Sequence, residues 1–296
     1  LLVRLNDFHQ VTVIRDHHVS EVISIDLSES FSASPDATVN ISLNEKNSLD
    51  IKTEIKTSLL IAADGAQSGI RKKLMMDTRE WEYGHDAIVT TVRTEKSHAS
   101  TAWQRFISTG PLAFLPLTTS KGDDHYCSIV WSLSKELVPE MMSKTDEEFS
   151  TALGIAFENK LGVIESVAKR FSFPLKQRHA VDYIKPGVAL IGDAAHTIHP
   201  LAGQGVNLGL LDVQVLAAEI VRAVMRGVPL NDFSLLKRYQ RQRKPDNLTM
   251  MAAMEGFKRL FGSSNPTLHI LRNEGMGRLN SIPLLKNAIA RKAMGL

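Results

Sequence analysis

The first third of the chain alternates apolar and polar residues in three short runs, at residues 23–27, 39–43 and 51–55. Polar stretches at residues 32–36 and 44–47 separate these runs. Alternation with a period of two is typical of strands that have one covered face, and polar turns between them favour a hairpin-like order. The pattern therefore predicts a small antiparallel meander, with apolar positions at Ile23, Ile25, Leu27, Val39, Ile41, Leu43, Ile51 and Ile55.

Two later strands have a different pattern. Residues 59–63 are apolar without alternation and stop at Asp64-Gly65, ahead of a helix predicted over residues 68–76. Residues 188–191 repeat this arrangement and stop at Gly192-Asp193. Continuous short apolar runs are typical of strands buried on both faces, as in parallel sheets. We therefore expect both segments to lie inside a layered α/β domain.

A long amphipathic helix is predicted after the second of these strands. It begins near Gly205, and Gly227 followed by Pro229 is a typical end signal. The apolar residues recur at helical spacing, which predicts one stripe that faces the core. The members of this stripe are Val213, Leu216, Ala217, Ile220, Val221 and Val224. Beyond residue 231 the chain reads as helical again, and Pro245 predicts a kink or a break.

Residues 80–180 are richer in aromatic and β-forming residues, with one helix between them. Thr145 and Glu148 have the spacing of a capping box at the start of that helix. We read this stretch as a second domain, a mixed sheet with at least one helix. The predicted organisation is a partial dinucleotide-type domain at 1–78, an inserted domain at 79–182, the second part of the first domain at 183–230, and C-terminal helices at 231–296. The fold class is α/β with mixed α+β character.

Composition narrows the class of protein. The 296 residues carry 35 Lys and Arg against 32 Asp and Glu, a net charge of +3, which argues against a chain that coats nucleic acid. Cys127 is the only cysteine, so no internal disulfide forms, and a reducing, cytoplasmic location is expected. No apolar run reaches the roughly 18 residues of a membrane span. The chain opens at Leu1 in apolar material without Met, and we read it as part of a longer protein.

The stretch from Gly192 to Asn207 carries the most chemical information. A buried strand delivers Asp193 at its carboxyl end, where ligands of open α/β sheets bind, and a glycine loop then opens a helix. Asp193 can accept hydrogen bonds from sugar-like hydroxyls, while Gly203 and Gly205 let the backbone approach a ligand closely. Free N–H groups in the first helical turn favour negative charge. The alternative is that Asp193 merely caps a turn.

Several motifs in the same order resemble the flavin-dependent aromatic-ring monooxygenases of the para-hydroxybenzoate hydroxylase fold, and within them the ubiquinone-biosynthesis hydroxylases. The resemblance covers nearly the whole chain. It rests on Ala63-Asp64-Gly65-Ala66-Gln67-Ser68 with Arg71, Thr101-Ala102-Trp103-Gln104-Arg105-Phe106, Gly110-Pro111-Leu112-Ala113-Phe114-Leu115-Pro116-Leu117, Ser128-Ile129-Val130-Trp131-Ser132, the motif that begins at Gly192-Asp193, and Gly256-Phe257-Lys258-Arg259-Leu260-Phe261.

The resemblance implies FAD as cofactor and NAD(P)H as reductant. Asp193 would bind the ribityl chain, Pro200 would lie against the isoalloxazine, and backbone groups around the helix start would sit near N1 and the C2 carbonyl. Asp64-Gly65 would serve the pyrophosphate and the passage of NAD(P)H, although a helix N-cap is the alternative for Asp64. The implied cofactor set is Asp64, Gly65, Gly192, Asp193, Pro200, Gly203, Gln204, Gly205, Val206 and Asn207, with Pro200 and Gly205 nearest the reacting flavin and no side-chain acid or base assigned.

The implied reaction is hydroxylation of a phenol ring through a flavin C4a-hydroperoxide, with a polyprenylated phenol of ubiquinone biosynthesis as substrate. Other proteins of that pathway would be partners, and the protein would contact the inner membrane peripherally. Aromatic residues at strand spacing are candidates for an apolar substrate wall, and they also fit a packed core. These candidates are Trp103, Phe106, Phe114 and Trp131.

The chain departs from the family at one point. The Gly-x-Gly-x-x-Gly turn of an N-terminal βαβ unit is absent, because neither Gly203/Gly205 nor Gly275/Gly277 follows a strand with a third glycine in place. We therefore expect the 296 residues alone to bind FAD weakly or not at all. Two alternatives stay open: a hydroxylase or epoxidase of the same fold with another substrate, and a non-catalytic remnant that acts as a binding or scaffold subunit.

Three weaker signals complete the sequence picture. His196 and His199 lie three residues apart near Asp193, but no third strong ligand is close, so a metal site is disfavoured. Cys127 lies in a strand-like segment, which favours an inert thiol over a nucleophile. Residues 272–296 carry five basic residues and one acidic residue among apolar ones. This tail predicts either a basic amphipathic helix pair on an anionic membrane or a helix packed on its own domain.

Overall fold

The structure is a computed structural model of the chain. It describes residues 7–24, 39–45, 52–119, 122–198 and 205–262, with single positions at 4, 274, 282, 283 and 287. The chain divides into two compact units, and each is described by itself. Unit 1 consists of Leu1–Arg79, Arg178–Thr197 and Gly205–Leu248, and unit 2 consists of Glu80–Gln177, Ile198–Gln204 and Thr249–Leu296.

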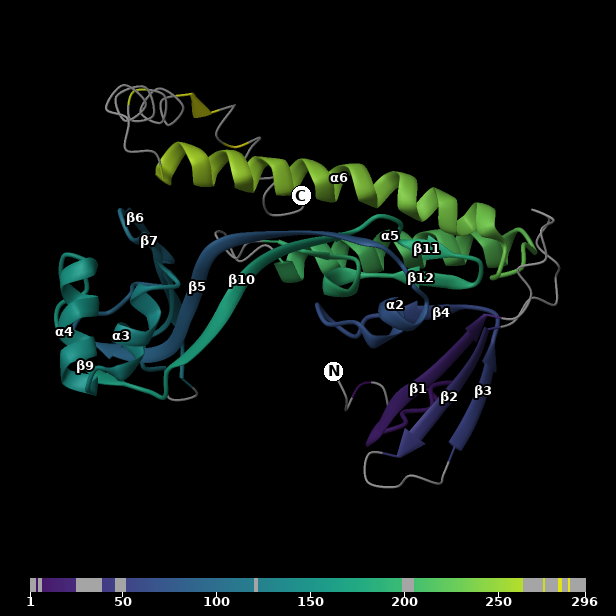
Figure 1. The fold of residues 1–296 in the computed structure, drawn as a ribbon, viewed down its shortest axis with the longest axis horizontal. Helices are drawn as coiled ribbons and strands as arrows, with labels where there is room; N and C mark the ends of the chain where they lie inside the picture. The colour runs from purple at the N-terminus through teal and green to yellow at the C-terminus, as the bar shows by residue number, and fades with distance from the viewer. Residues whose placement is uncertain are drawn as a thin grey trace. The chain divides into compact units, whose positions relative to one another are not determined.

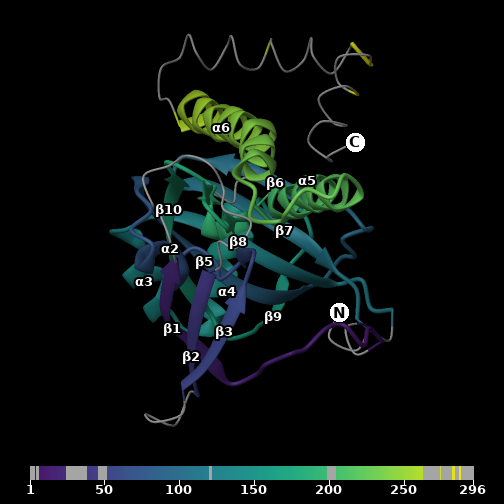
Figure 2. The same cartoon turned by 90° about the vertical axis from the view of Figure 1, so that its right-hand side faces the viewer.

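The predicted meander is confirmed in unit 1. Its strands are β1 (His17–Ser24), β2 (Val39–Glu45) and β3 (Lys52–Thr57), which pair antiparallel in the order β1-β2-β3 (Figures 1 and 2). Val39 and Ile41 are buried, as the alternation predicts. Residues 25–38 and 46–51, which include the predicted apolar positions Ile25, Leu27 and Ile51, lie outside the described residues.

A second sheet of unit 1 holds the two strands that precede the Asp-Gly and Gly-Asp pairs. Its order is β11 (Ile184–Lys185), β12 (Val188–Leu190) and β4 (Leu60–Ala62), and β12 runs parallel to β4. All of β12 is buried, which confirms the prediction for that strand. The prediction of two covered faces is wrong for β4, since Ile61 is 40% exposed. The cause is position, because β4 is the edge strand of this sheet among the described strands.

Three helices belong wholly or partly to unit 1: α2 (Gly69–Lys73), α5 (Gly205–Met225) and α6 (Phe233–Gly262) (Figure 1). Ser68 caps α2, where its Oγ accepts a hydrogen bond from Arg71 N at 2.9 Å. α6 continues through Pro245, so the predicted break is not present. Tyr239 on α6 is buried and donates its hydroxyl to Leu190 O of β12 at 2.8 Å, which anchors this helix to the parallel strand.

The long helix α5 is present as predicted, but the predicted core face is largely wrong. Val213, Val221 and Val224 are exposed. The buried positions are instead Leu208, Asp212, Leu216, Glu219 and Ala223. A hydrophobicity pattern misses this face because two of its five members are carboxylates, each of which is neutralised by basic side chains of α6.

Unit 2 contains a sheet in the order β10-β5-β8-β7-β6, with β9 also paired to β5. Two helices pack on its core, and α4 has the predicted capping box: Glu148 N donates to Thr145 Oγ1 at 3.2 Å, and Thr145 N donates to the Glu148 carboxylate at 2.9 Å. The elements are β5 (Thr78–Thr94), β6 (Trp103–Ile107), β7 (Gly110–Leu117), β8 (Tyr126–Ser134), β9 (Ile164–Val167), β10 (Phe171–Ala180), α3 (Leu137–Ser143) and α4 (Asp146–Ala156).

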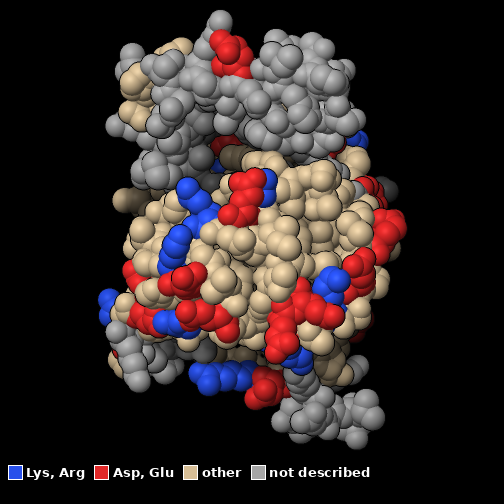
Figure 3. All heavy atoms as spheres, turned by 90° about the vertical axis from the view of Figure 1, so that its left-hand side faces the viewer, with Lys and Arg blue, Asp and Glu red and all other residues tan. Residues whose placement is uncertain are grey.

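Acidic and basic side chains are interspersed over the molecular face drawn in Figure 3. In unit 2 the pairs include Lys135 with Glu82 at 2.9 Å and Lys176 with the same carboxylate at 2.6 Å. Hydrogen bonds from Lys176 and Lys135 lower the pKa of Glu82 to about 2. Among the described helices, none is both long and apolar enough to cross a bilayer. The basic tail predicted at residues 272–296 lies almost wholly outside the described residues.

Candidate functional site

Two aspartates follow neighbouring parallel strands at the same edge of the unit 1 sheet. Leu190 of β12 pairs with Ala62 of β4, and Ile191 N donates to Ala62 O at 3.0 Å. Asp64 and Asp193 come two and three residues beyond these paired positions. The carboxyl ends of parallel strands are where open α/β sheets bind their ligands. The geometry therefore brings the two predicted motifs to one place.

The Gly-Asp pair forms a tight turn of 3-10 helix, η1 (Gly192–Ala194). Gly192 has φ +56°, a conformation that favours glycine. α5 passes close behind it, since a Cβ added at Gly209 would lie 3.3 Å from Gly192 Cα. Asp193 is exposed, whereas Ala194 and Ala195 are buried. The turn therefore presents one carboxylate to the surface and packs its other side against the domain.

The Asp-Gly turn lies one strand away and has the left-handed glycine that such a turn needs, Gly65 with φ +80°. Asp64 is exposed, and its Oδ2 accepts a hydrogen bond from Ile70 N of α2 at 3.1 Å. The N-cap of α2 is Ser68, so the alternative of Asp64 as the helix N-cap is wrong, although its carboxylate does bond to the second residue of the helix. This bond does not by itself decide the ligand role, because an exposed carboxylate has room for a second interaction.

Buried arginines tie the two turns together. Arg71 is 3% exposed, and its guanidinium donates to Ala194 O at 2.6 Å and to Ala66 O at 2.9 Å. Arg178, near the end of β10, also donates to Ala66 O. Arg71 is part of a motif on which the family resemblance rests, but its bridging role could not be predicted from the sequence. Both of its acceptors are backbone carbonyls, and one of them, Ala194 O, lies 123 positions away in the chain.

The start of α5 completes the described part of the site. Val206 is 72% exposed and Asn207 is also exposed, so the first turn of this 21-residue helix faces outward. The N–H groups of a first helical turn have no partner within the helix, and they carry the positive end of its dipole. Among the described residues, no atom lies within 4 Å of a Cβ added at Gly205. Pro200, Gly203 and Gln204 lie outside the described residues.

A buried polar network lies behind the Gly-Asp turn, and it centres on Asp212 of α5. Its Oδ2 accepts from Gly192 N at 2.9 Å and is 2.6 Å from His196 Nε2. Its Oδ1 accepts from Arg243 Nε at 2.8 Å and from Asn247 Nδ2 at 3.3 Å. The five residues of the network come from three separate stretches of chain, 192–196, 212 and 243–247, which only the folded structure brings together.

The network holds Asp212 in its ionised form. Burial, the largest single influence, raises the pKa of this carboxyl, but hydrogen bonds from His196, Arg243 and Gly192 N together outweigh it, and the pKa is lowered overall. A carboxylate only accepts hydrogen bonds, so the proton of His196 lies on Nε2. No periodic signal in the sequence points to this network, because Asp212 and Arg243 lie on different helices, 31 residues apart.

His196, a residue of the metal site considered from the sequence, is buried and bonded to Asp212. Its side chain is 1% exposed, whereas that of Asp193 is exposed. His179 pairs with His196 across β10 and β13 (His196–Thr197) and is also buried. Burial, with Lys244, His196 and Arg79 nearby, lowers the pKa of His179 to about 4. His199 lies outside the described residues.

The four candidates for a substrate wall all belong to unit 2, but they differ in how far their side chains are buried. Phe114 and Trp131 are buried in the core, where Phe114 stacks on Phe157 with ring centroids 4.0 Å apart. Trp103 pairs with Phe114 across β6 and β7 and packs against the same core. Phe106 lies three positions further along β6, on the other face of the strand, and is 38% exposed. Phe106 is thus the candidate with the most accessible side chain.

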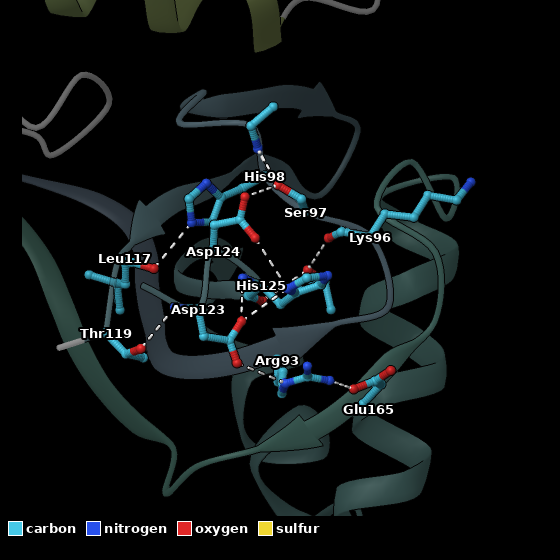
Figure 4. Close-up of polar contacts among 12 residues, drawn as sticks. Arg93, Lys96, Ser97, His98, Leu117, Thr119, Asp123, Asp124, His125 and Glu165 are labelled. Carbon is cyan, nitrogen blue, oxygen red and sulfur yellow. Dashed lines mark hydrogen bonds and ion pairs between the residues drawn. The ribbon is translucent and has the colours of Figure 1, made fainter. Parts of the chain in front are cut away.

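A group of acids and a histidine in unit 2 has the composition of a cation site. Ligand atoms of Asp123, Asp124 and His125 lie within 4.8 Å of one another (Figure 4). Hydrogen bonds within the loop account for this arrangement: His125 N donates to Asp123 Oδ1 at 3.0 Å, and Ser97 Oγ donates to Asp124 Oδ2 at 2.5 Å. The backbone bond from His125 lowers the pKa of Asp123, and the Ser97 bond lowers that of Asp124. We interpret the group as a set of hydrogen-bonded residues that hold this loop in place.

Cys127 is buried in β8, and burial raises the pKa of its thiol to about 11. A thiol that stays protonated at neutral pH is a poor nucleophile, which agrees with the sequence interpretation of Cys127 as inert.

Comparison with known proteins defines the class to which this fold and site belong. Residues 11–253 match the family described as "FAD binding domain", and the chain belongs to that family. Among its relatives, 3-demethoxyubiquinol 3-hydroxylase of Escherichia coli (strain K12) is 37% identical over 242 residues, 82% of this chain and 60% of that protein. The ubiquinone biosynthesis monooxygenase COQ6, mitochondrial, of Homo sapiens is 36% identical over 268 residues, 79% of this chain and 56% of that protein. The chain thus spans between half and two thirds of the length of these relatives.

Solved structures support the fold. The chain is similar to OxyS anhydrotetracycline hydroxylase from Streptomyces rimosus, with a TM-score of 0.67 at 22% identity over 97% of this chain and 53% of that one. It is also similar to p-nitrophenol 4-monooxygenase PnpA from Pseudomonas putida DLL-E4, with a TM-score of 0.67 at 18% identity over 92% of this chain and 64% of that one. At such identity these likenesses establish architecture, which confirms the predicted fold class.

Proposed function

We propose that the protein is an FAD-dependent monooxygenase that hydroxylates the aromatic ring of a polyprenylated phenol in ubiquinone biosynthesis, with NAD(P)H as reductant and O2 as co-substrate. The observation that carries the proposal is the Gly-Asp turn, where an exposed Asp193 stands beside the outward-facing first turn of α5. Family membership and the names of the relatives support the proposed reaction and substrate class.

The described residues fit FAD by the chemistry of their donors and acceptors. Asp193 is an exposed acceptor at the carboxyl end of a parallel strand, which suits the hydroxyls of a ribityl chain. The first turn of α5 offers N–H donors and positive potential, and none of the described atoms blocks close approach at Gly205. Asp64-Gly65, which the arginine pair ties to the same edge, would serve the pyrophosphate side.

When bound, FAD supplies hydride acceptance from NAD(P)H and the activation of oxygen. The residues of this chain bind and orient it. Asp193 would hold the ribityl hydroxyls, while the N–H groups near Val206 and Asn207 would favour negative charge on the bound ring system. No side chain among those described is assigned as acid or base. For Pro200, Gly203 and Gln204 the proposal rests on the family resemblance alone, which places Pro200 against the isoalloxazine and the other two in the glycine loop.

The substrate proposal rests on the relatives. Their names refer to ubiquinone biosynthesis and to demethoxyubiquinol, and a ubiquinol has a phenolic (hydroquinone) ring with a polyprenyl tail. A site for such a substrate must exclude water near the reacting ring, since water releases the activated oxygen unproductively. Phe106 is the proposed aromatic wall residue with an accessible side chain. Peripheral contact with the inner membrane and with other proteins of the pathway completes the proposal, because the substrate tail resides in lipid.

Product analysis with matched substrates tests the substrate class. The natural, full-length protein is incubated with FAD, NADH or NADPH, and either a polyprenylated phenol or the same phenol without its tail. We expect a hydroxylated product from the prenylated ring, detected by mass spectrometry, and little from the other. Equal conversion of the unprenylated phenol would favour a same-fold hydroxylase with another substrate.

A further inference from the structure

The Gly-Asp turn has a second layer of residues that determines its shape. Asp212 is fully buried and receives the N–H of Gly192, the first residue of the turn, at 2.9 Å. The same oxygen lies 2.6 Å from His196 Nε2, two residues beyond the end of the turn. One carboxylate oxygen therefore holds the turn at both of its ends, and Asp193 lies between these two anchors.

The other oxygen of Asp212 connects the turn to α6. Arg243 Nε donates to it at 2.8 Å, and Asn247 Nδ2 donates to it at 3.3 Å. Arg243 Nη2 also donates to Asn247 Oδ1 at 2.9 Å, and the amide of Asn247 contacts the Tyr183 hydroxyl at 3.3 Å. Both oxygens of the buried carboxylate are thus occupied by donors, and the helix that carries Asp212 is locked in register with the turn.

We infer that Asp212 is a positioning residue: with His196 and Arg243 it fixes the Gly192–Ala194 turn so that the exposed Asp193 carboxylate is held where a ligand's hydroxyls can bond to it. The inference rests on the proposed function for its ligand, FAD. Asp212 itself is buried beneath the turn, so it acts through Gly192 and His196 rather than by touching the cofactor.

Substitution of Asp212 by asparagine tests this because an amide cannot replace the carboxylate here. Each oxygen of Asp212 faces two donors, so the NH2 group of asparagine opposes donors whichever way the amide is turned. α5 also offers a matched control. Glu219 lies seven residues later, about two turns along the same buried face, and its partners Arg222, Arg238 and Gln242 belong to α5 and α6.

The first measurement uses hydrogen exchange on the natural, full-length protein without cofactor. In D212N, the amides of residues 192–196 should exchange about tenfold faster or more than in the wild type, because a bond to a charged partner is lost. E219Q should leave these amides unchanged. Equal exchange at 192–196 in both variants would overturn the inference, whether or not the protein binds FAD.

The second measurement is the affinity for FAD, determined per folded molecule by fluorescence titration. D212N should bind FAD about tenfold to a hundredfold more weakly than the wild type. This range is the one seen when a residue that orients a metal ligand is replaced, and Asp212 orients Asp193 in the same indirect way. E219Q should bind like the wild type. H196A should weaken binding, and H196Q should restore much of it, since a glutamine amide can donate to Asp212 from a similar position. Equal affinities of D212N and E219Q would overturn the inference while leaving the proposed function intact. A wild-type protein that binds no FAD would overturn the proposed function, and hydrogen exchange would still decide the role of Asp212 in holding the turn.

Discussion

Replacement of Asp193 by alanine should release FAD from the natural, full-length protein. The Asp193 carboxylate is exposed at the carboxyl end of β12, on a turn whose backbone is fixed from behind. A hydrogen bond to a charged group contributes about 1.5–3 kcal/mol, so the loss of two such bonds to ribityl hydroxyls lowers affinity by roughly 100-fold or more. Because its side chain points outward, removing it should leave the fold nearly unchanged.

Absorbance of the purified protein measures this effect as the ratio of flavin to protein. Asp77→Ala is a suitable control, since Asp77 is another exposed acid of unit 1 that lies outside both turns. We expect stoichiometric flavin with D77A and flavin near background with D193A, at similar melting temperatures. Full flavin content in D193A would show that the Gly-Asp turn does not bind the ribityl chain.

His179 should make the folded protein sensitive to mild acid. Its pKa is lowered from the ordinary 6.5 to about 4, first by burial and then by Lys244, His196 and Arg79. Between these two values the unfolded chain binds a proton that the folded chain does not, so the free energy of unfolding rises with pH in this window. The stabilisation of the folded state by the neutral His179 is complete above pH 6.5. As the pH falls from 6.5 towards 4, the free energy of unfolding decreases by about 3 kcal/mol from this residue.

Urea unfolding at several pH values between 4 and 7 tests this expectation. His179→Gln should flatten the dependence of unfolding free energy on pH in this window, because glutamine does not titrate. His9→Gln, at an exposed position of the same unit, is the control. If H179Q shows the wild-type slope, the buried neutral state of His179 is not the source of the acid sensitivity.

Local patterns in the sequence were sufficient to predict much of the fold. The meander follows from alternation, α4 from the Thr145 and Glu148 spacing, and β12 from a short unbroken apolar run. These features depend on residues close together in the chain. Ile61 is different, because its exposure depends on β4 being an edge strand, which only the arrangement of the sheet determines.

The buried face of α5 could not be predicted from hydrophobicity. Asp212 and Glu219 lie on that face because Arg243 and Arg238 of α6 neutralise them, and these partners are 31 and 19 residues away. Burying a charge is costly unless it is paired, and a pairing between helices leaves no periodic signal in either one. The predicted apolar stripe with Val213, Val221 and Val224 therefore gave the wrong orientation of α5, because it took no account of the paired carboxylates.

The candidate site also has one part that the sequence predicted and another part that only the structure revealed. Asp64, Gly65, Gly192 and Asp193 were predicted from the motifs, and the structure places both pairs at one sheet edge. The sequence did not reveal the arginine bridge of Arg71, because its acceptors are backbone carbonyls that every residue possesses. Side-chain identity therefore predicted which residues lie at this sheet edge, and the folded structure was needed to show what holds them in place.

Isotope labelling tests the central claim most directly. The natural, full-length protein is supplied with FAD, NADH or NADPH, a polyprenylated phenol and ¹⁸O2, and the product is analysed by mass spectrometry. A monooxygenase transfers one atom of O2 to the ring, so the account predicts a single ¹⁸O in the hydroxylated product and no product with D193A. A product whose new oxygen comes from water, or undiminished hydroxylation by D193A, would contradict it.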